Sequence, residues 1–249
     1  MAADQAFANL KELTDRIGMV YGTEDWCMFM YSLVKMQTPL NVLELGTGLG
    51  ATALWVAQAM KEVGAGKIFT IDNGQDWSEI LAKSPELFTP LQRTLDFRAY
   101  MADLVAQFSL QAHLEHLQVT MPPYPEFEPG LDMLFSDFRH GPNDILAILG
   151  HFLPRMNESS SIFIDSASTS FPSYALLELL VVQLNAGKLP GMLLKATPAA
   201  MHESLWRQVR GSRYTLMHMV ERKARLQNST AWLKIEPVDL RPYPQAPFH

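Results

Sequence analysis

Short apolar segments alternate with longer helical patterns between residues 41 and 186 of this 249-residue chain. Each apolar segment is bounded by glycine, proline or polar residues, which is typical of the buried strands of a parallel sheet. We predict such strands at 41–45, 67–72, 117–121, 131–137 and 161–165, and helices at 4–18, 24–36, 50–62, 90–113 (one helix or two shorter ones), 142–153 and 173–186. The alternation predicts an α/β fold with a doubly wound, mostly parallel sheet.

The pattern changes after residue 186. Two segments, 214–220 and 230–237, have the composition of strands, and a turn rich in basic residues separates them. Strands joined by so short a connection are antiparallel neighbours. We expect this hairpin at one edge of the sheet, which brings the predicted strands to seven, and a proline-rich extension follows residue 237.

The first predicted strand ends in a turn with three glycines, Gly46, Gly48 and Gly50, and the turn opens into a helix. Glycine permits a tight turn and a close approach of the backbone to a ligand. The spacing G-x-G-x-G differs from a phosphate-binding loop, because no lysine follows, and from the dinucleotide fingerprint G-x-G-x-x-G. We therefore predict that an adenosine-containing cofactor binds against the main chain of this turn.

Three later strands each end in a carboxylate. Asp72 ends the second strand, Asp137 ends the fourth with His140 three residues later, and Asp165 ends the fifth. Because ligands of such sheets bind at the carboxyl ends of the strands, we expect these side chains near the glycine turn. Glu44 lies inside the otherwise apolar first strand, where a polar side chain requires a partner.

The composition limits the classes of function. A formal charge of −6 and a pI of about 5.6 argue against a nucleic-acid-binding protein, which normally has a basic face. The single cysteine, Cys27, excludes an intrachain disulfide and fits a reducing cytoplasm. No signal peptide is apparent, and no apolar segment reaches the roughly 20 residues that span a bilayer. We expect a cytoplasmic protein that binds neither nucleic acid nor membranes, and the sequence leaves a homodimer open.

The segment Val-Leu-Glu-Leu-Gly-Thr-Gly-Leu-Gly at 42–50 resembles the first motif of class I S-adenosylmethionine-dependent methyltransferases. The acidic Asp72 and the late hairpin agree with this Rossmann-like family, and the resemblance covers about residues 20 to 240. It implies S-adenosylmethionine as the cofactor, with Asp72 on the ribose and Glu44 near the methionine end. The cofactor-binding residues that it implies are Glu44, Gly46, Thr47, Gly48, Gly50, Asp72, Asn73 and Asp137. It also implies an N-terminal helical lid over the substrate at 1–38 and a methyltransferase domain at 39–249.

A second segment, Leu134 to His140, is similar to the I-D-G-x-H segment of small-molecule O-methyltransferases related to cephalosporin-type and macrolide-sugar enzymes. In some of those enzymes the aspartate ligates a divalent metal, the histidine acts as the base, and an acidic pair ending the fifth strand completes the metal site. Asp137 and His140 match, whereas the fifth strand ends in Asp165-Ser166 and supplies one carboxylate. The resemblance implies Asp137, His140 and Asp165 as catalytic residues. It also implies Asp137 and Asp165 as candidate ligands of Mg²⁺, which prefers oxygen ligands and retains several waters.

The resemblance further implies methyl transfer to a hydroxyl, or to an amine, of a small molecule in specialised metabolism. A histidine suits the removal of a hydroxyl proton near neutral pH, so we predict that His140 is the general base, the alternative being that it only orders its own loop. Asp165 has three open roles, which are to orient His140, to bind a metal or to contact the substrate.

The substrate contacts that we predict come from two segments. Tyr21 and Trp26 lie in the expected lid, where ordinary helix packing is the alternative, and Ser166 lies in the loop after the fifth strand. Two other functions stay open at this point. The chain could methylate a peptide or carrier-bound substrate, or it could be a non-catalytic binding protein with a methyltransferase fold.

Overall fold

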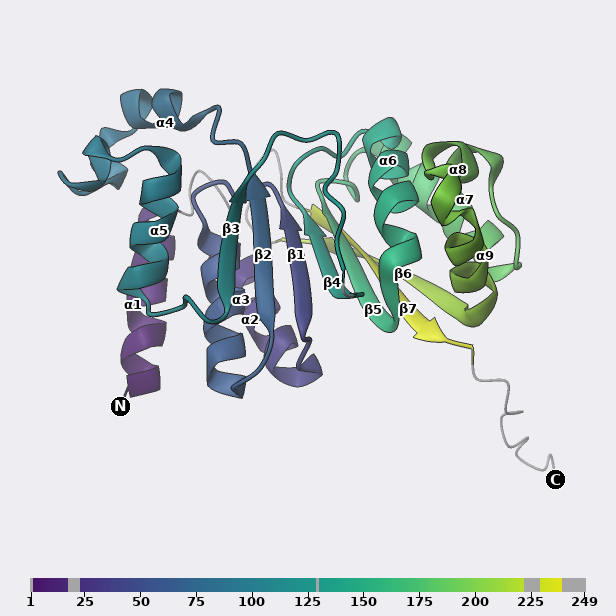
Figure 1. The fold of residues 1–249 in the computed structure, drawn as a ribbon, viewed down its shortest axis with the longest axis horizontal. Helices are drawn as coiled ribbons and strands as arrows, with labels where there is room; N and C mark the ends of the chain where they lie inside the picture. The colour runs from purple at the N-terminus through teal and green to yellow at the C-terminus, as the bar shows by residue number, and fades with distance from the viewer. Residues whose placement is uncertain (1, 18–22, 129, 222–228, 239–249) are drawn as a thin grey trace.

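The computed structural model describes residues 2–17, 23–128, 130–221 and 229–238. Seven strands form a sheet in the order β3-β2-β1-β4-β5-β7-β6 (Figure 1). Strands β1 to β5 are parallel, and β7 is antiparallel to both β5 and β6. The strands are β1 (Asn41–Leu45), β2 (Lys67–Asp72), β3 (Leu114–Gln118), β4 (Leu131–Ser136), β5 (Met156–Asp165), β6 (Ser212–Val220) and β7 (Ser229–Pro237). The doubly wound fold and the C-terminal antiparallel hairpin predicted from the sequence are thus confirmed.

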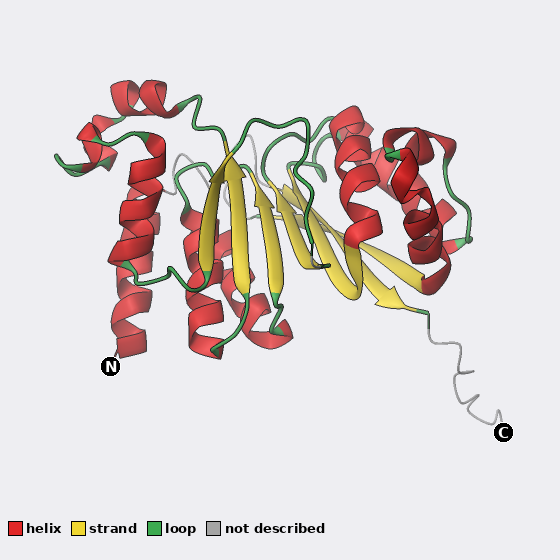
Figure 2. Ribbon diagram, in the orientation of Figure 1, coloured by secondary structure: helices red, strands yellow, loops and turns green. Residues whose placement is uncertain are grey.

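Helices cover both faces of the sheet (Figure 2). Successive side chains of a strand point to opposite faces, and those of β1 enter two different cores. Val42 belongs to a core cluster to which α1 (Ala2–Ile17), α2 (Glu24–Gln37), α3 (Ala51–Val63), α4 (Trp77–Lys83) and α5 (Phe97–Gln107) contribute. Leu43 belongs to a second cluster to which α6 (Pro142–Phe152), α7 (Phe171–Asn185), α8 (Gly191–Ala196) and α9 (His202–Gly211) contribute. The sheet therefore lies between two layers of helices.

The N-terminal helices share the core of the sheet. Leu10 of α1 and Met30 of α2 are fully buried in the same cluster as Val42. Helix α2 begins after Thr23, whose Oγ1 accepts a 3.1 Å hydrogen bond from the backbone N–H of Trp26. Helices α1 and α2 are therefore joined to the sheet by packing, and the role of residues 1–38 as a substrate lid stays a prediction.

Several element boundaries differ from the prediction. The predicted helix at 90–113 is confined to α5, because the Asp96 side chain accepts from the Ala99 backbone N–H at 2.7 Å and fixes its start. Strand β3 begins three residues earlier than predicted, at Leu114, and β5 begins at Met156, before three exposed polar residues that carry no apolar signal. The sequence prediction did not include α4, α8 or α9. In the described part of the chain, no helix combines the length and apolar character needed to cross a membrane.

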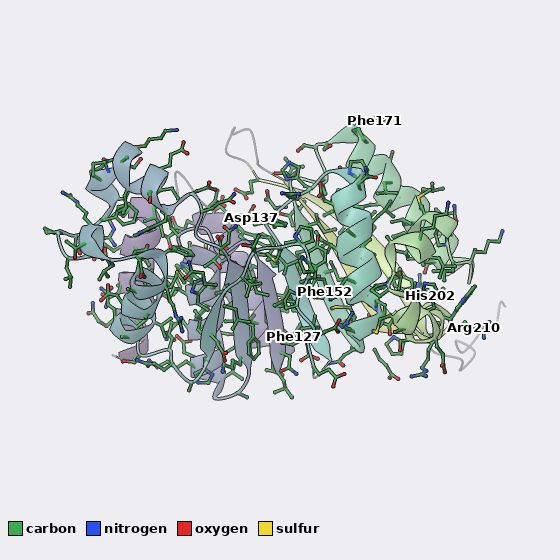
Figure 3. All side chains as sticks on the ribbon, turned by 45° about the horizontal axis from the view of Figure 1, so that its top comes forward. Phe127, Asp137, Phe152, Phe171, His202 and Arg210 are labelled. Carbon is green, nitrogen blue, oxygen red and sulfur yellow. The ribbon has the colours of Figure 1, made fainter. Side chains whose placement is uncertain are left out.

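The topology brings two predicted motifs together. Strands β1 and β4 are neighbours, although β2 and β3 lie between them in the sequence. Their carboxyl ends flank the point at which the strand order reverses, and α/β sheets bind ligands there. The glycine turn follows β1 and Asp137 follows β4, and Figure 3 places Asp137 near the middle of the molecule.

Candidate active site

The glycine turn has a backbone that other residues would strain. Gly46, Gly48 and Gly50 have φ angles of +90°, +53° and +87°, which L-residues other than glycine rarely adopt. The Gly46 N–H donates to the carbonyl of Ile71 at 2.9 Å. A Cβ on Gly46 would lie 2.6 Å from the carbonyl oxygen of Asp137. The loop after β4 therefore packs directly against the turn, and only glycine fits between them.

Asp72 holds the glycine turn from the neighbouring strand. Its Oδ2 accepts hydrogen bonds from the backbone N–H groups of Thr47 at 3.1 Å and Gly48 at 3.3 Å, and its Oδ1 accepts from Gly74 at 2.8 Å. A carboxylate has about four acceptor positions, so these three bonds leave capacity for a ribose hydroxyl. Asn73 lies beside it, and its side chain forms hydrogen bonds with the backbone and side chain of Gln75.

Glu44 has the partner that a buried polar residue requires. Its side chain is 2% exposed, and its Oε2 accepts a 2.5 Å hydrogen bond from Thr70 Oγ1, the residue paired with it on β2. Thr70 Oγ1 also lies 2.6 Å from Thr47 Oγ1, which links the strand to the glycine turn. Burial, reinforced by the charges of Asp137 and Asp72, raises the pKa of Glu44 to about 8. A cationic group of a bound cofactor would favour the carboxylate form.

The two later carboxylates lie at the ends of adjacent strands. Ser136 pairs with Ile164, so Asp137, directly after β4, and Asp165, the last residue of β5, occupy equivalent places at the ends of the two strands. Asp137 is exposed and donates its backbone N–H to the carbonyl of Leu45, whereas Asp165 is buried. Their strands thus place both carboxylates at the edge where the glycine turn lies.

Ser166, predicted to contact substrate, forms a hydrogen bond with the neighbouring Asp165. Its side chain is buried, and its Oγ donates to Asp165 Oδ2 at 2.6 Å. Its φ of +58° is rare for a serine, and its backbone N–H donates to the carbonyl of Ser229 at 2.6 Å. The loop after β5 is therefore tied to β7, and the serine hydroxyl is used to hold the aspartate.

His140 is half-buried in the loop between β4 and α6. Its carbonyl accepts a 2.6 Å hydrogen bond from Ser173 Oγ, and Gly141 forms the N-cap of α6. The backbone of His140 is thus fixed three residues beyond Asp137, on the same loop.

The predicted metal site would use the carboxylates of Asp137 and Asp165. Among the residues that the structure describes, no group of three or more histidine, cysteine, aspartate or glutamate side chains could hold a metal ion. Mg²⁺ usually takes one or two carboxylates and retains several waters, so its coordination by Asp137 and Asp165 stays a prediction.

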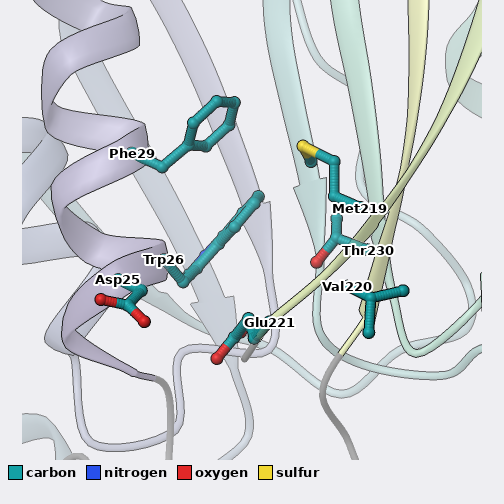
Figure 4. Close-up of a pocket in the computed structure, with 7 residues that line it drawn as sticks. All are labelled: Asp25, Trp26, Phe29, Met219, Val220, Glu221 and Thr230. Carbon is teal, nitrogen blue, oxygen red and sulfur yellow. The ribbon is translucent and has the colours of Figure 1, made fainter. Parts of the chain in front are cut away.

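A pocket of about 340 Å³ opens between α2 and the β6–β7 hairpin (Figure 4). Its walls carry an indole, a phenyl ring, a thioether and two carboxylates. The lining residues are Asp25, Trp26, Phe29, Met219, Val220, Glu221 and Thr230. The volume is at the small end of the range for small-molecule sites.

The pocket lies next to the carboxylate edge. Thr230 pairs with Asp165 across β7 and β5. The Trp26 ring packs 4.9 Å from Phe135 and 5.7 Å from Phe163, measured between centroids. Each phenylalanine comes two residues before a carboxylate, and residues two apart on a strand share a face.

Of the predicted substrate contacts, Trp26 lines this pocket, Ser166 does not, and Tyr21 lies outside the described residues. Sequence reasoning missed the contributions of β6 and β7. Phe29 could have been found, since it lies three residues after Trp26 on the same helix face. Met219 and Thr230 face each other only through the register of the hairpin, which the sequence pattern did not fix.

Solved structures share the fold over nearly the full chain. An O-methyltransferase from Bacillus cereus in complex with S-adenosylhomocysteine matches with a TM-score of 0.52 and 12% identity, over 93% of this chain and 91% of that one. A Podospora anserina methyltransferase bound to S-adenosylhomocysteine matches with a TM-score of 0.51 and 12% identity, over 96% of this chain and 88% of that one. A methyltransferase from Geobacter sulfurreducens matches with a TM-score of 0.52 and 12% identity, over 93% of this chain and 90% of that one.

Among curated proteins, no sequence matches the chain. The model of a family described as a methyltransferase domain, in contrast, matches residues 43–167. This match covers half of the chain, from β1 through the loop after β5, and includes the glycine turn, Asp72, Asp137 and Asp165. The chain therefore belongs to the class I S-adenosylmethionine-dependent methyltransferases.

Proposed function

We propose that this enzyme transfers the methyl group of S-adenosylmethionine to a hydroxyl of a small molecule bound in the pocket between α2 and the hairpin, with an amine as the alternative acceptor. The observation that carries the proposal is the position of the pocket. Thr230 in one wall of the pocket pairs with Asp165. Trp26 in another wall packs against Phe135 and Phe163, on the strands that lead to Asp137 and Asp165. A volume of about 340 Å³ suits one small molecule. We extend the proposal to an acceptor from specialised metabolism because the Asp137–His140 segment resembles that of small-molecule O-methyltransferases.

The residues of the first two strands would hold the cofactor. The glycine turn would lie against it with bare backbone, Asp72 would accept from the ribose, and Glu44 would face the cationic methionine end. When bound, S-adenosylmethionine supplies a methyl group on a positively charged sulfur. The chain must then place the acceptor atom in line with that methyl group, and positioning of this kind accounts for much of the rate enhancement of a displacement reaction.

The acceptor hydroxyl must also lose a proton. We assign this step to His140, which lies on the loop that begins with Asp137 at the sheet edge. Asp165, held in place by Ser166, would orient the histidine or the acceptor. Removal of a positioned general base typically costs about 10²- to 10⁴-fold in rate.

Two measurements test the proposal. Isothermal titration should show binding of S-adenosylmethionine and S-adenosylhomocysteine, and turnover of hydroxylated aromatic compounds should be visible as methylated products by mass spectrometry. His140→Ala should lower kcat by roughly 100-fold or more and leave the affinity for S-adenosylhomocysteine near that of the wild type. His202→Ala is the matched control, since His202 lies on α9 and bonds only the nearby carbonyl of Thr197 in the described chain. Unchanged kcat in His140→Ala would rule out the base assignment.

A further inference from the structure

Three buried side chains form a continuous line of hydrogen bonds from β1 to the glycine turn. Glu44 Oε2 lies 2.5 Å from Thr70 Oγ1, and Thr70 Oγ1 lies 2.6 Å from Thr47 Oγ1. Thr47 belongs to the turn itself, between Gly46 and Gly48. A carboxyl group inside the sheet is therefore connected to a hydroxyl of the turn against which the cofactor would lie.

The direction of these hydrogen bonds depends on the charge of Glu44, because each threonine hydroxyl has a single hydrogen to donate. If Glu44 is ionised, Thr70 donates to the carboxylate and Thr47 must donate to Thr70. The Thr47 hydroxyl can then only accept from a ligand. If Glu44 instead carries a proton on Oε2, it donates to Thr70 and Thr70 donates to Thr47. The hydrogen of Thr47 is then available to a ligand.

The surroundings of Glu44 favour the protonated acid and place its proton on this line. Oε2 has Thr70 as its partner, whereas Oε1 accepts no hydrogen bond within the described part of the chain. The charges that act on Glu44 come from Asp137 and Asp72, and both are negative. Phe135, its partner on β4, is apolar. Burial and the two negative charges raise the pKa of Glu44 to about 8.

We propose that Glu44 gives up a proton to the solvent when a cationic cofactor binds on the glycine turn, and that Thr70 passes this change to Thr47 by reversing both hydrogen bonds. S-adenosylmethionine has two positive groups, an ammonium and a sulfonium, and S-adenosylhomocysteine keeps the ammonium. A positive charge nearby favours the carboxylate, and Thr47 then presents lone pairs, which suit an N–H donor. The inference rests on the proposed place of the cofactor, with Glu44 toward its cationic end.

Calorimetry of S-adenosylhomocysteine binding to the full chain at about pH 7 measures this proton release. The titration is repeated in phosphate, HEPES and Tris, and the dependence of the heat on the ionisation enthalpy of the buffer gives the number of protons. We expect on the order of one proton per bound ligand, and an affinity that rises up to roughly tenfold per pH unit as the pH approaches the pKa of Glu44. Glu44→Gln should release none and bind with an affinity independent of pH.

The same titration with S-adenosylmethionine separates the two positive groups. Equal release with both ligands would assign the effect to the ammonium, and greater release with S-adenosylmethionine would assign it to the sulfonium. Either result supports the inference.

A double-mutant cycle tests the part assigned to Thr70. Thr47→Val and Glu44→Gln each remove one end of the line, and their effects on S-adenosylhomocysteine affinity should depart from additivity by at least roughly threefold. The two effects should add in a Thr70→Val background, whereas Thr70→Ser keeps the hydroxyl and should keep the coupling. Thr197→Val is the matched control, because Thr197 is also buried and donates to the carbonyl of Leu193 at 2.8 Å, in the other helix layer. It should change neither affinity nor proton release.

The outcomes separate the inference from the function beneath it. If both cofactors bind without proton release, the inference is wrong while the proposed function stands. Release that persists in Glu44→Gln would assign the proton to another group and would also overturn it. Additive effects of Thr47→Val and Glu44→Gln with Thr70 intact would exclude the transmission through Thr70. Failure to bind either cofactor would count against the proposed function itself.

Discussion

The proposed cofactor side and the proposed acceptor side of the site are built differently. The cofactor side is formed by residues 44–74, in which the glycine turn, Asp72 and Glu44 are fixed to one another by hydrogen bonds between neighbouring strands. The acceptor side joins α2 near the N-terminus to the β6–β7 hairpin near the C-terminus, and its walls are mostly rings and a thioether. Residues close in sequence and fixed by hydrogen bonds suit a cofactor that does not vary. A pocket lined by segments far apart in sequence can differ in its side chains according to the acceptor.

The substitution with the largest expected effect is Gly46→Ala, on the cofactor side. The new Cβ would lie 2.6 Å from the Asp137 carbonyl at a φ of +90°. We expect a loss on the order of 4 kcal/mol in the free energy of unfolding, or loss of S-adenosylhomocysteine binding if the loop moves. Gly64→Ala is the control, because Gly64 has a φ of +82° and nothing within 4 Å of its added Cβ, so it should cost only about 1 kcal/mol. Equal costs, measured by denaturant unfolding, would contradict the close packing of the two loops.

The next effect is a pH dependence on the cofactor side. Because the folded pKa of Glu44 is raised to about 8, its contribution is fully present below the unfolded pKa of about 4.5 and is lost as the pH rises to about 8. Glu44→Gln keeps a neutral acceptor for Thr70 and should remove this loss. We expect the variant to gain up to about 4 kcal/mol relative to the wild type between pH 5 and pH 9. Parallel stability curves for the two proteins would show that Glu44 does not titrate in this interval.

A smaller effect is expected for Asp72→Asn. The amide has one acceptor oxygen and cannot serve Gly74, the glycine turn and a ribose hydroxyl together. Affinity for S-adenosylhomocysteine should fall roughly tenfold, about the value of one hydrogen bond to a charged group. Asp76→Asn, at the N-cap of α4 where the aspartate side chain forms no capping bond, should leave the affinity unchanged. Equal S-adenosylhomocysteine affinities of Asp72→Asn and Asp76→Asn would contradict a role of Asp72 in cofactor binding.

The smallest change concerns the acceptor side. Trp26→Phe keeps an aromatic wall but removes the Nε1–H that has no partner in the described chain. We expect the acceptor KM to rise by roughly two- to fivefold, the value of one modest hydrogen bond, with S-adenosylhomocysteine affinity unchanged. Trp55→Phe serves as the comparison, because the Trp55 Nε1–H donates to Thr14 at 2.7 Å and its loss should lower stability rather than raise KM. A fall in S-adenosylhomocysteine affinity for Trp26→Phe would show that Trp26 also affects cofactor binding, and would contradict the separation of the two sides.

The same division explains what the sequence could predict. The glycine spacing, the apolar strands and the strand-end carboxylates are local patterns, and they predicted the fold, the cofactor and the place of Asp72, Asp137 and Asp165. The inward turn of Ser166 depends on a contact with Ser229, 63 residues away. The pairing of Met219 with Thr230 depends on hairpin register. Neither contact leaves a periodic signal in the sequence, so the pocket proposed as the acceptor side could be located only in the structure.

The most direct test of the account is a crystal structure of the full chain with S-adenosylhomocysteine. The account predicts that the adenosyl ribose contacts Asp72, that the glycine turn lies against the ligand, and that the sulfur faces the space between Asp137 and the pocket walled by Trp26. A sulfur that faces away from this pocket, or a ligand bound elsewhere on the sheet, would contradict it.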